Sequence, residues 1–474
     1  MVRKIDKRKR KGVVMVLFTM MMLFVILPAV GLAVDAGVMF AIKAKMQAAA
    51  DGASLAAARS LSRGMTFASQ QASATATAKK FYRINIQNGW LGLDSAADPT
   101  VTFPTLSLNT MSIHVDVQVA APTYFMRILG PSSVTLRSRS EVNRRFVNLA
   151  LVLDRSGSLA NSGSCPGLRS AATDFTNMFV NGTDQLSLVT FGTTYRTDFP
   201  LNNDFLSRSG GGDIPSLIGG INCAGGTNAA SGYMTGANAL IAAGQPGALN
   251  VVVFFTDGMP TAVHLPAIPM VGGGSPGCAI TTPRDGVVTY GGTVAYGVTT
   301  PIEPHAPGSV IASDWTQALN TPLNTGCKWA SDVTQLNDDT NRLTGNGSTN
   351  WMDKFGTSLT GSYSLTMGGS SPNQYVSLSW QNIDNMAKNA LISAANRTRV
   401  LSAANNTNVL AYVVGLGNTT NPPDTNLLKR LANTNDSSYY DSTYPAGDMI
   451  YATNNDELHA AFARLASEIL RITM

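Results

Sequence analysis

The longest uncharged apolar run of the chain lies near its start, from Gly12 to Val34. About 20 apolar residues are enough to cross the hydrocarbon core of a bilayer, so this run predicts a transmembrane helix. Seven of the first eleven residues are Lys or Arg, against one Asp, and such a flank favours a cytoplasmic N-terminus. The alternative is a cleaved signal peptide with Gly31 and Ala33 before the cleavage point. Since the apolar core of a signal peptide usually spans only about 7–15 residues, we expect a retained anchor.

The pattern beyond this run indicates a small region outside the cytoplasm. An alanine-rich helix without proline is expected to continue the anchor to about Arg63, and a second helix to cover residues 66–85. Apolar and polar residues then alternate over residues 112–130 and 132–142, which predicts strands. Residues 35–146 are therefore predicted to form an extracytoplasmic α+β region.

From Val147 onward, short apolar runs alternate with segments of helical period. Such runs are typical of strands buried on both faces of a parallel sheet that helices cover. We predict a doubly wound, Rossmann-like α/β domain over residues 147–474. The expected strands are residues 147–153, 185–191, 249–255 and 408–417. The expected helices are residues 167–180, 230–244, 382–404, 425–433 and 456–472.

One segment interrupts this alternation. Residues 262–379 are rich in Gly, Pro, Ser, Thr and Asn and show no useful helical period. Because a structureless loop of this length is improbable inside a compact domain, we expect a folded, mostly β insertion. Two alternating runs around Gly291 and Gly292 predict a hairpin within it.

Charge and composition narrow the class of protein. The net charge is +5 over 474 residues, but residues 1–11 alone carry +6, which leaves −1 for the remainder. The basic tail therefore flanks the membrane span on the cytoplasmic side, and no groove for nucleic acid is implied. Only 13% of the residues are charged, which is low and favours an extracytoplasmic surface.

Oxygen-bearing side chains follow the predicted strands. Asp154, Ser156 and Ser158 come directly after one strand, Asp257 follows another, and Thr227 lies in a Gly-rich turn between them. In a doubly wound fold, ligands bind beyond the carboxyl ends of the strands, so we expect these side chains to meet. Such hard oxygen donors select Mg²⁺, Ca²⁺ or Mn²⁺. The alternative is that the acids only cap turns and helices.

The D-x-S-G-S, G-G-T-N and T-D-G motifs resemble, in order and context, the metal-ion-dependent adhesion site of von Willebrand factor A domains. The resemblance covers about residues 147–261 and 380–470. It implies a metal held by the two serines and the threonine, with the aspartates acting directly or through water. A protein partner would add an acidic side chain. The implied metal-site residues are Asp154, Ser156, Ser158, Thr227 and Asp257.

The front of the chain resembles TadE/TadG-type assembly proteins of Flp pili. The resemblance rests on the basic tail, the apolar run and the Ala-rich helix, and it covers about residues 1–145. A von Willebrand A domain after such a front end is similar to the TadG-like arrangement. One departure concerns type IV prepilins, which carry Glu five residues after a Gly. Here Leu17 stands five residues after Gly12, so we expect an anchored accessory protein and not the main pilin.

Four cysteines are spread over the second half of the chain without a C-x-x-C motif. Disulfides are the default outside the cytoplasm, although four unpaired thiols are the alternative. Cys165 follows the serine loop and Cys223 precedes Thr227, so we expect them to pair. Cys278 and Cys327 both lie in the insertion and form the second expected pair.

Motifs for catalysis are missing from the sequence. It contains no G-x-S-x-G elbow, no P-loop and no dinucleotide fingerprint, and its four histidines are scattered. We therefore expect a binding protein of the bacterial inner membrane, with one span and its bulk in the periplasm or outside the cell. A pilus assembly or anchoring factor is the first hypothesis and a free-standing adhesin the second. A metal-assisted hydrolase is the third.

Overall fold

The computed structural model describes residues 9–61, 67–87, 89–93, 97–107, 110–206, 212–268, 352–353, 355–368, 379–417 and 423–473, together with short strands at 271–272, 284–289, 294–296, 327–328, 335–337 and 375–377. The chain forms two compact units. The first comprises residues 1–64 and 68–144, and the second comprises residues 65–67 and 145–474.

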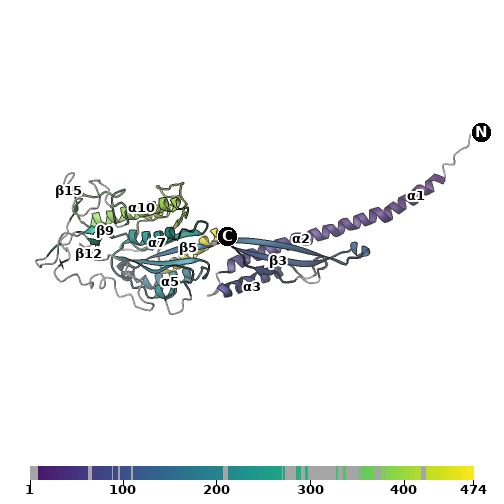
Figure 1. The fold of residues 1–474 in the computed structure, drawn as a ribbon, viewed down its shortest axis with the longest axis horizontal. Coiled ribbons are helices and arrows are strands. Elements are labelled where there is room, and N and C mark those ends of the chain that lie inside the picture. Colours follow the sequence, from purple (N-terminus) through teal and green to yellow (C-terminus); the bar gives the residue numbers. More distant parts are fainter. Residues whose placement is uncertain are drawn as a thin grey trace, which may run out of the picture. The chain divides into compact units, whose positions relative to one another are not determined.

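The first unit begins with a nearly continuous helix (Figure 1) made of α1 (Lys9–Met21), the π-helical turn η1 (Met22–Ile26) and α2 (Leu27–Ser60). Pro28 lies in the first turn of α2. Its ring has no N–H to donate to the preceding turn, which explains why the helix widens just before it. Among the described residues, this helix alone is long and apolar enough to cross a membrane.

Beyond the apolar run, α2 buries one stripe of small side chains. Ala50, Ala53 and Ala57 recur every three to four residues, and none of them is exposed, as expected for a helix packed on one face. Ser54 Oγ lies 2.9 Å from Ser140 Oγ of the neighbouring sheet. The predicted continuation of the anchor is confirmed to within three residues, and α3 (Phe67–Asn85) is the second predicted helix.

The sheet of the first unit has four strands. They are β1 (Thr100–Thr102), β2 (Thr105–Ser107), β3 (Thr110–Pro122) and β4 (Ser133–Arg145), and β3 pairs with the other three. Alternate β3 residues from Ile113 to Ala121 are buried, which is the period of two that the sequence predicts. The predicted strand over residues 112–130 is too long, because Met126–Leu129 form a 3₁₀ turn, η3.

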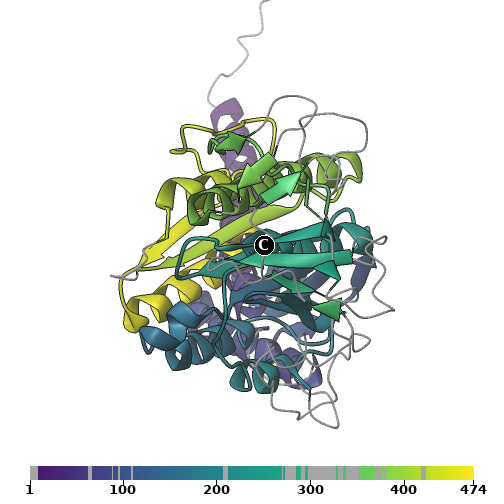
Figure 2. The same cartoon turned by 90° about the vertical axis from the view of Figure 1, so that its left-hand side faces the viewer.

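The second unit is built on a sheet of six strands (Figure 2) in the order β18-β17-β8-β5-β6-β7. All neighbouring strands are parallel except β6 and β7. The strands are β5 (Val147–Asp154), β6 (Gln185–Phe191), β7 (Tyr195–Asn202), β8 (Leu249–Thr256), β17 (Leu410–Leu416) and β18 (Met449–Ala452).

Helices cover both faces of this sheet, because successive residues of a buried strand point to opposite sides. Ala150 and Val152 pack under α7 (Ala229–Ala243), α10 (Trp380–Ala404) and α11 (Thr425–Ala432). Leu149, Leu151 and Leu153 pack under α5 (Cys165–Thr176), α6 (Ile214–Gly219) and α12 (Asn455–Ile472). The predicted doubly wound α/β fold is confirmed.

Two strands of the sheet were not predicted, β7 and β18. β7 makes the sheet mixed, because it pairs with β6 antiparallel at one edge of the predicted parallel sheet. The connection from β6 is a tight turn in which Gly192 N donates to Thr194 O at 2.8 Å. So short a link joins antiparallel neighbours, whereas parallel strands need a long crossover.

The residues that the structure describes between β8 and α10 include eight short strands. They are β9 (Ala262–Ile268), β10 (Val271–Gly272), β11 (Arg284–Thr289), β12 (Val294–Tyr296), β13 (Cys327–Lys328), β14 (Gln335–Asn337), β15 (Met367–Gly368) and β16 (Tyr375–Ser377). They form three small antiparallel sheets. The two runs of the predicted hairpin pair in antiparallel fashion, Val288 with Val294, and the turn predicted at Gly291 and Gly292 lies outside the described residues.

Asp353 lies buried in this segment, with its Oδ1 accepting hydrogen bonds from Phe355 N and Thr357 N. Burial raises the pKa of this carboxyl to about 6. A carboxyl with a raised folded-state pKa binds its proton more tightly in the folded chain, so its contribution to stability is lost as the pH rises from about 4 to about 6.

We therefore expect Asp353→Asn to raise the free energy of unfolding at pH 7.5 by about 1–2 kcal/mol, since an amide keeps the acceptor without the buried charge. Urea titrations of residues 145–474 at pH 7.5 and pH 4 provide the measurement. The gain should vanish at pH 4, where the wild-type carboxyl is protonated. An equal gain at both pH values would contradict this assignment.

Candidate metal site at the carboxyl edge of the sheet

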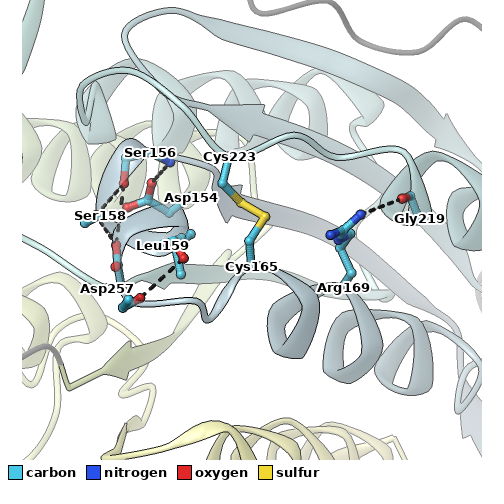
Figure 3. Close-up of a disulfide and its surroundings, with 10 residues drawn as sticks. Asp154, Ser156, Ser158, Leu159, Cys165, Arg169, Gly219, Cys223 and Asp257 are labelled. Carbon is cyan, nitrogen blue, oxygen red and sulfur yellow. Dashed lines mark hydrogen bonds between the residues drawn. A yellow bond between two sulfur atoms is a disulfide. The ribbon is translucent and has the colours of Figure 1, made fainter.

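The first loop of the site leaves the sheet at Asp154, the last residue of β5, and turns at once into the short helix α4 (Gly157–Asn161). Asp154 holds this turn, because its Oδ1 accepts a hydrogen bond from Ser156 N at 2.8 Å. The two predicted serines thus begin α4 beside the end of their own strand. Figure 3 shows their hydroxyls on the same side as the carboxylate of Asp257.

The second acid reaches this loop from the neighbouring strand. Asp257 follows β8, which pairs with β5 in parallel, so the two strand ends lie together. Ser158 Oγ donates to Asp257 Oδ1 at 2.6 Å, and Ser156 Oγ lies 3.5 Å from the same oxygen. The two serine hydroxyls are 2.9 Å apart. The structure therefore places one carboxylate and both predicted serines in a single oxygen cluster.

The end of β8 also holds Asp154 in place. Its Oδ2 accepts a hydrogen bond from Thr256 Oγ1 at 2.6 Å. Both of its oxygens are thus engaged by protein donors, Ser156 N and Thr256 Oγ1. This arrangement fits a carboxylate that orients the loop and adds negative charge behind the oxygen cluster.

The Gly-rich loop that carries Thr227, called the middle loop below, contacts the first loop through backbone hydrogen bonds. Gly157 N donates to Gly225 O at 2.9 Å, and Ala224 N donates to Arg155 O at 2.7 Å. Gly225 has a φ of +87°, a left-handed conformation that glycine adopts without strain. The sharp turn it makes brings the Gly-rich segment next to the serine loop.

Thr227 is positioned by the segment that follows Asp257. Its N–H donates to Thr261 Oγ1 at 3.0 Å, and its carbonyl accepts from Thr261 N at 2.9 Å. Thr227 is 4% exposed. Its placement rests on these backbone contacts, so all five predicted site residues come from three loops held together at one edge of the sheet.

Two acids are buried together in this cluster. Asp154 and Asp257 are both fully shielded from solvent. Burial, and then the neighbouring charge of Asp257, raise the pKa of Asp154 to about 7. Asp154 therefore resists ionisation in the cation-free site, and a divalent cation at the cluster would relieve the repulsion between the two carboxylates.

The donor set fits Mg²⁺ in type and spacing. Ligand oxygens at 2.0–2.1 Å from an octahedral Mg²⁺ stand about 2.9 Å apart. The oxygens of Ser156, Ser158 and Asp257 are 2.6–3.5 Å apart. By contrast, the described residues contain no group of three or more His, Cys, Asp or Glu side chains that could hold a metal. The site thus matches a cation that prefers carboxylates and hydroxyls.

A disulfide at the rim of the site, beside the oxygen cluster, joins α5 to the segment just before the Gly-rich loop. Cys165, at the start of α5, is bonded to Cys223, directly before the middle loop, with a Cα–Cα distance of 6.2 Å. Figure 3 shows this bond beside the oxygen cluster. The first predicted pairing is confirmed. For the second, Cys327 is described only as part of β13, and Cys278 lies outside the described residues.

Sequence reasoning missed the roles of two residues that shape the site. Thr256 donates a hydrogen bond to Asp154, and Thr261 holds Thr227. The signal for Thr256 was available, since it immediately precedes Asp257. Thr261 had no comparable signal, because its role depends on how two distant loops meet.

Two family models match separate parts of the chain. Residues 149–259 match the model of the von Willebrand factor type A domain. Residues 12–60 match the Flp pilus-assembly TadE/G-like model. Among curated proteins, none matches the chain.

Several solved structures are similar to the chain at low identity. The von Willebrand factor domain of the type V pili tip protein Mfa5 from Porphyromonas gingivalis is 13% identical, with a TM-score of 0.36, over 70% of this chain and 97% of that one. The pilus adhesin SpaC from Lactobacillus rhamnosus GG is 12% identical, with a TM-score of 0.36, over 79% and 34%. Proximal thread matrix protein 1 of the mussel byssus is 13% identical, with a TM-score of 0.32, over 68% and 47%.

Proposed function

Because the chain combines a von Willebrand factor type A domain with a TadE/G-like N-terminal segment, we propose that it is a membrane-anchored, protein-binding subunit of Flp-type pilus assembly. The TadE/G-like match favours assembly or anchoring over the second hypothesis, a free-standing adhesin. The long apolar helix supports a single-pass anchor. The proposal places this anchor in the bacterial inner membrane, with residues 1–11 in the cytoplasm.

The observation that carries the binding role is the oxygen cluster at the carboxyl edge of the sheet. We propose that Ser156, Ser158 and Asp257 hold a divalent cation, with Thr227 and Asp154 completing the site directly or through water. Mg²⁺ is the first candidate, and Ca²⁺ and Mn²⁺ take the same oxygen donors. When bound, the ion supplies an electrophilic centre for an incoming carboxylate.

A protein partner with an exposed Asp or Glu fits this site. Neutral hydroxyls contribute no negative charge, so the ion keeps part of its charge for a further acidic ligand. Binding therefore explains the donor set without any chemical step. A metal-assisted hydrolase would need a general base beside the metal to activate water, and neither acid suits that role. Asp154 is held by two protein donors, and Asp257 accepts from Ser158 within the metal cluster itself.

The same proposal assigns a role to each segment of the chain. Residues 12–34 form the span, residues 35–146 the extracytoplasmic TadE/G-like region, and residues 147–474 the von Willebrand A domain with the insertion 262–379. The insertion starts a few residues after Asp257, since its first strand, β9, begins at Ala262. The insertion therefore begins next to the metal edge, where it can shape the surface that a partner meets.

The test is a chromosomal Asp257→Ala variant, with surface pili counted by electron microscopy. We expect pili to be lost as in a deletion strain, because the partner carboxylate no longer finds the ion. Asp174→Ala is the matched control, since Asp174 is an exposed acid on α5 away from the cluster. Normal pili in the Asp257→Ala strain would contradict the assembly role. Normal pili with lost surface attachment would favour the adhesin.

A further inference from the structure

The loop between β3 and β4, residues 123–132, lies along the apolar helix of the first unit and is called the β3–β4 tip below. Gly31 faces Phe125 so closely that a Cβ on Gly31 would stand 2.8 Å from the Phe125 side chain. A groove of about 340 Å³ runs between the helix and the tip. Its lining includes Leu23, Leu27 and Leu32 from the helix, and Phe125, Met126 and Ile128 from the tip.

These contacts fall inside the uncharged run, not beyond it. A helix rises about 1.5 Å per residue. Leu32 is therefore about 3 Å, and Leu23 about 17 Å, from Val34 along the axis toward the cytoplasmic end. If the helix spans the bilayer, the β3–β4 tip lies at the level of the leaflet that contains the Asp35 end.

The backbone of the tip is prepared for an environment without water. Asp35 is buried, and its carboxylate accepts hydrogen bonds from three successive amides of the tip. These are Tyr124 N at 2.9 Å, Phe125 N at 2.9 Å and Met126 N at 2.6 Å. Unsatisfied amides cost several kcal/mol each in lipid, so this contact spares the tip that cost at three successive amides.

Several apolar side chains of the tip are exposed. Ile128 is 82% exposed, and Tyr124 and Phe125 are each 47% exposed. Aromatic residues are enriched at the membrane interface, and the nearby Arg127 can extend its cation toward lipid phosphates. Such exposure is unfavourable in water but not in lipid.

We propose that the β3–β4 tip is a second membrane-binding element, which inserts its apolar side chains into the leaflet at the Asp35 end of the span. The occupant of this surface is lipid, because the tip continues the lipid-facing surface of the helix. The inference rests on the proposed membrane anchor. Asp35 acts as a positioning residue that ties the tip to the helix at a fixed depth.

Photo-crosslinking of the full chain in vesicles of phosphatidylethanolamine and phosphatidylglycerol tests the inference. The photoreactive residue p-benzoylphenylalanine replaces Ile128 in the tip, Phe18 in the span or Leu55 in α2. Leu55 is the matched control, since it is a partly exposed apolar residue about 30 Å beyond Val34 on the same helix. Mass spectrometry should find lipid adducts at positions 128 and 18, and none above the unirradiated background at position 55.

The outcomes separate the inference from the anchor on which it rests. Adducts at position 18 but none at position 128, or a cross-link from position 128 to a second copy or another protein, would overturn the inference and leave the anchor. No adduct at either position would overturn both. Asp35→Ala should reduce the adduct at position 128 and leave position 18 unchanged. An unchanged adduct at position 128 would overturn the role given to Asp35.

Discussion

Mg²⁺ is expected to raise the melting temperature of residues 145–474, and Asp257→Ala is expected to lose that rise entirely. A ligand at a hundred times its dissociation constant stabilises the folded state by about 2.7 kcal/mol, which corresponds to a shift of about 4 °C in a domain of this size. Asp257 Oδ1 stands 2.6 Å from Ser158 Oγ in the cluster. Its removal therefore takes away both a ligand and a compensating charge.

The variant should remain folded. Asp257 follows β8 and is not part of the apolar strand, and its removal relieves the repulsion that helps to raise the pKa of Asp154. In chelator, Asp257→Ala should melt close to the wild type. Thr227→Ala should retain part of the Mg²⁺ effect, because the lost ligand is neutral, and Asp174→Ala should retain all of it. Equal melting temperatures for the wild type with Mg²⁺ and with chelator would remove the basis of metal-gated binding.

The second large effect concerns the disulfide at the rim. The bond between Cys165 and Cys223 closes a loop with a sequence separation of 58 residues. In the chain-entropy description, a loop of this length stabilises the folded state by up to about 4 kcal/mol. The double variant Cys165→Ala and Cys223→Ala should therefore unfold at a markedly lower denaturant concentration than the wild type.

Urea titration of residues 145–474 measures this difference, and peptide mapping of the wild type provides the control. The map should recover Cys165 and Cys223 in one cross-linked peptide. Because the bond also fixes the start of the middle loop, the double variant should need more Mg²⁺ for the same rise in melting temperature. Superimposable titrations of variant and wild type would show that the bond contributes nothing.

The sequence predicted most of the large sheet because its central strands are buried on both faces. β5 and β8 are continuous apolar runs, and each ends in an acid at the same edge. Parallel strands in adjacent positions bring their carboxyl ends together, so motifs about a hundred residues apart were expected to meet. Ser158 and Asp257 do so directly, at 2.6 Å.

Edge strands, and turns held by side chains distant in the sequence, were not predictable in the same way. β7 and β18 lie at the two edges of the sheet, where a strand can form without a continuous apolar run. The 3₁₀ turn η3 follows an alternating segment, and the adjoining amides are held by Asp35 from about ninety residues earlier. No local pattern encodes such a contact, so the strand predicted over residues 112–130 wrongly included the turn.

The position of β5 has a mechanical consequence. The second unit is entered at Arg145, whose N–H donates to Thr473 O, and β5 then runs directly to Asp154 at the metal edge. Tension between a bound partner and the membrane segment would enter the domain at the ends of β5 and β8, which carry the cluster, and leave it through β5. β5 pairs in parallel with β6 and β8 along its length, so its hydrogen bonds would be loaded in shear, many at a time and not one by one. A pull on the metal edge would therefore be borne by the middle of the six-stranded sheet and not by its edge strands.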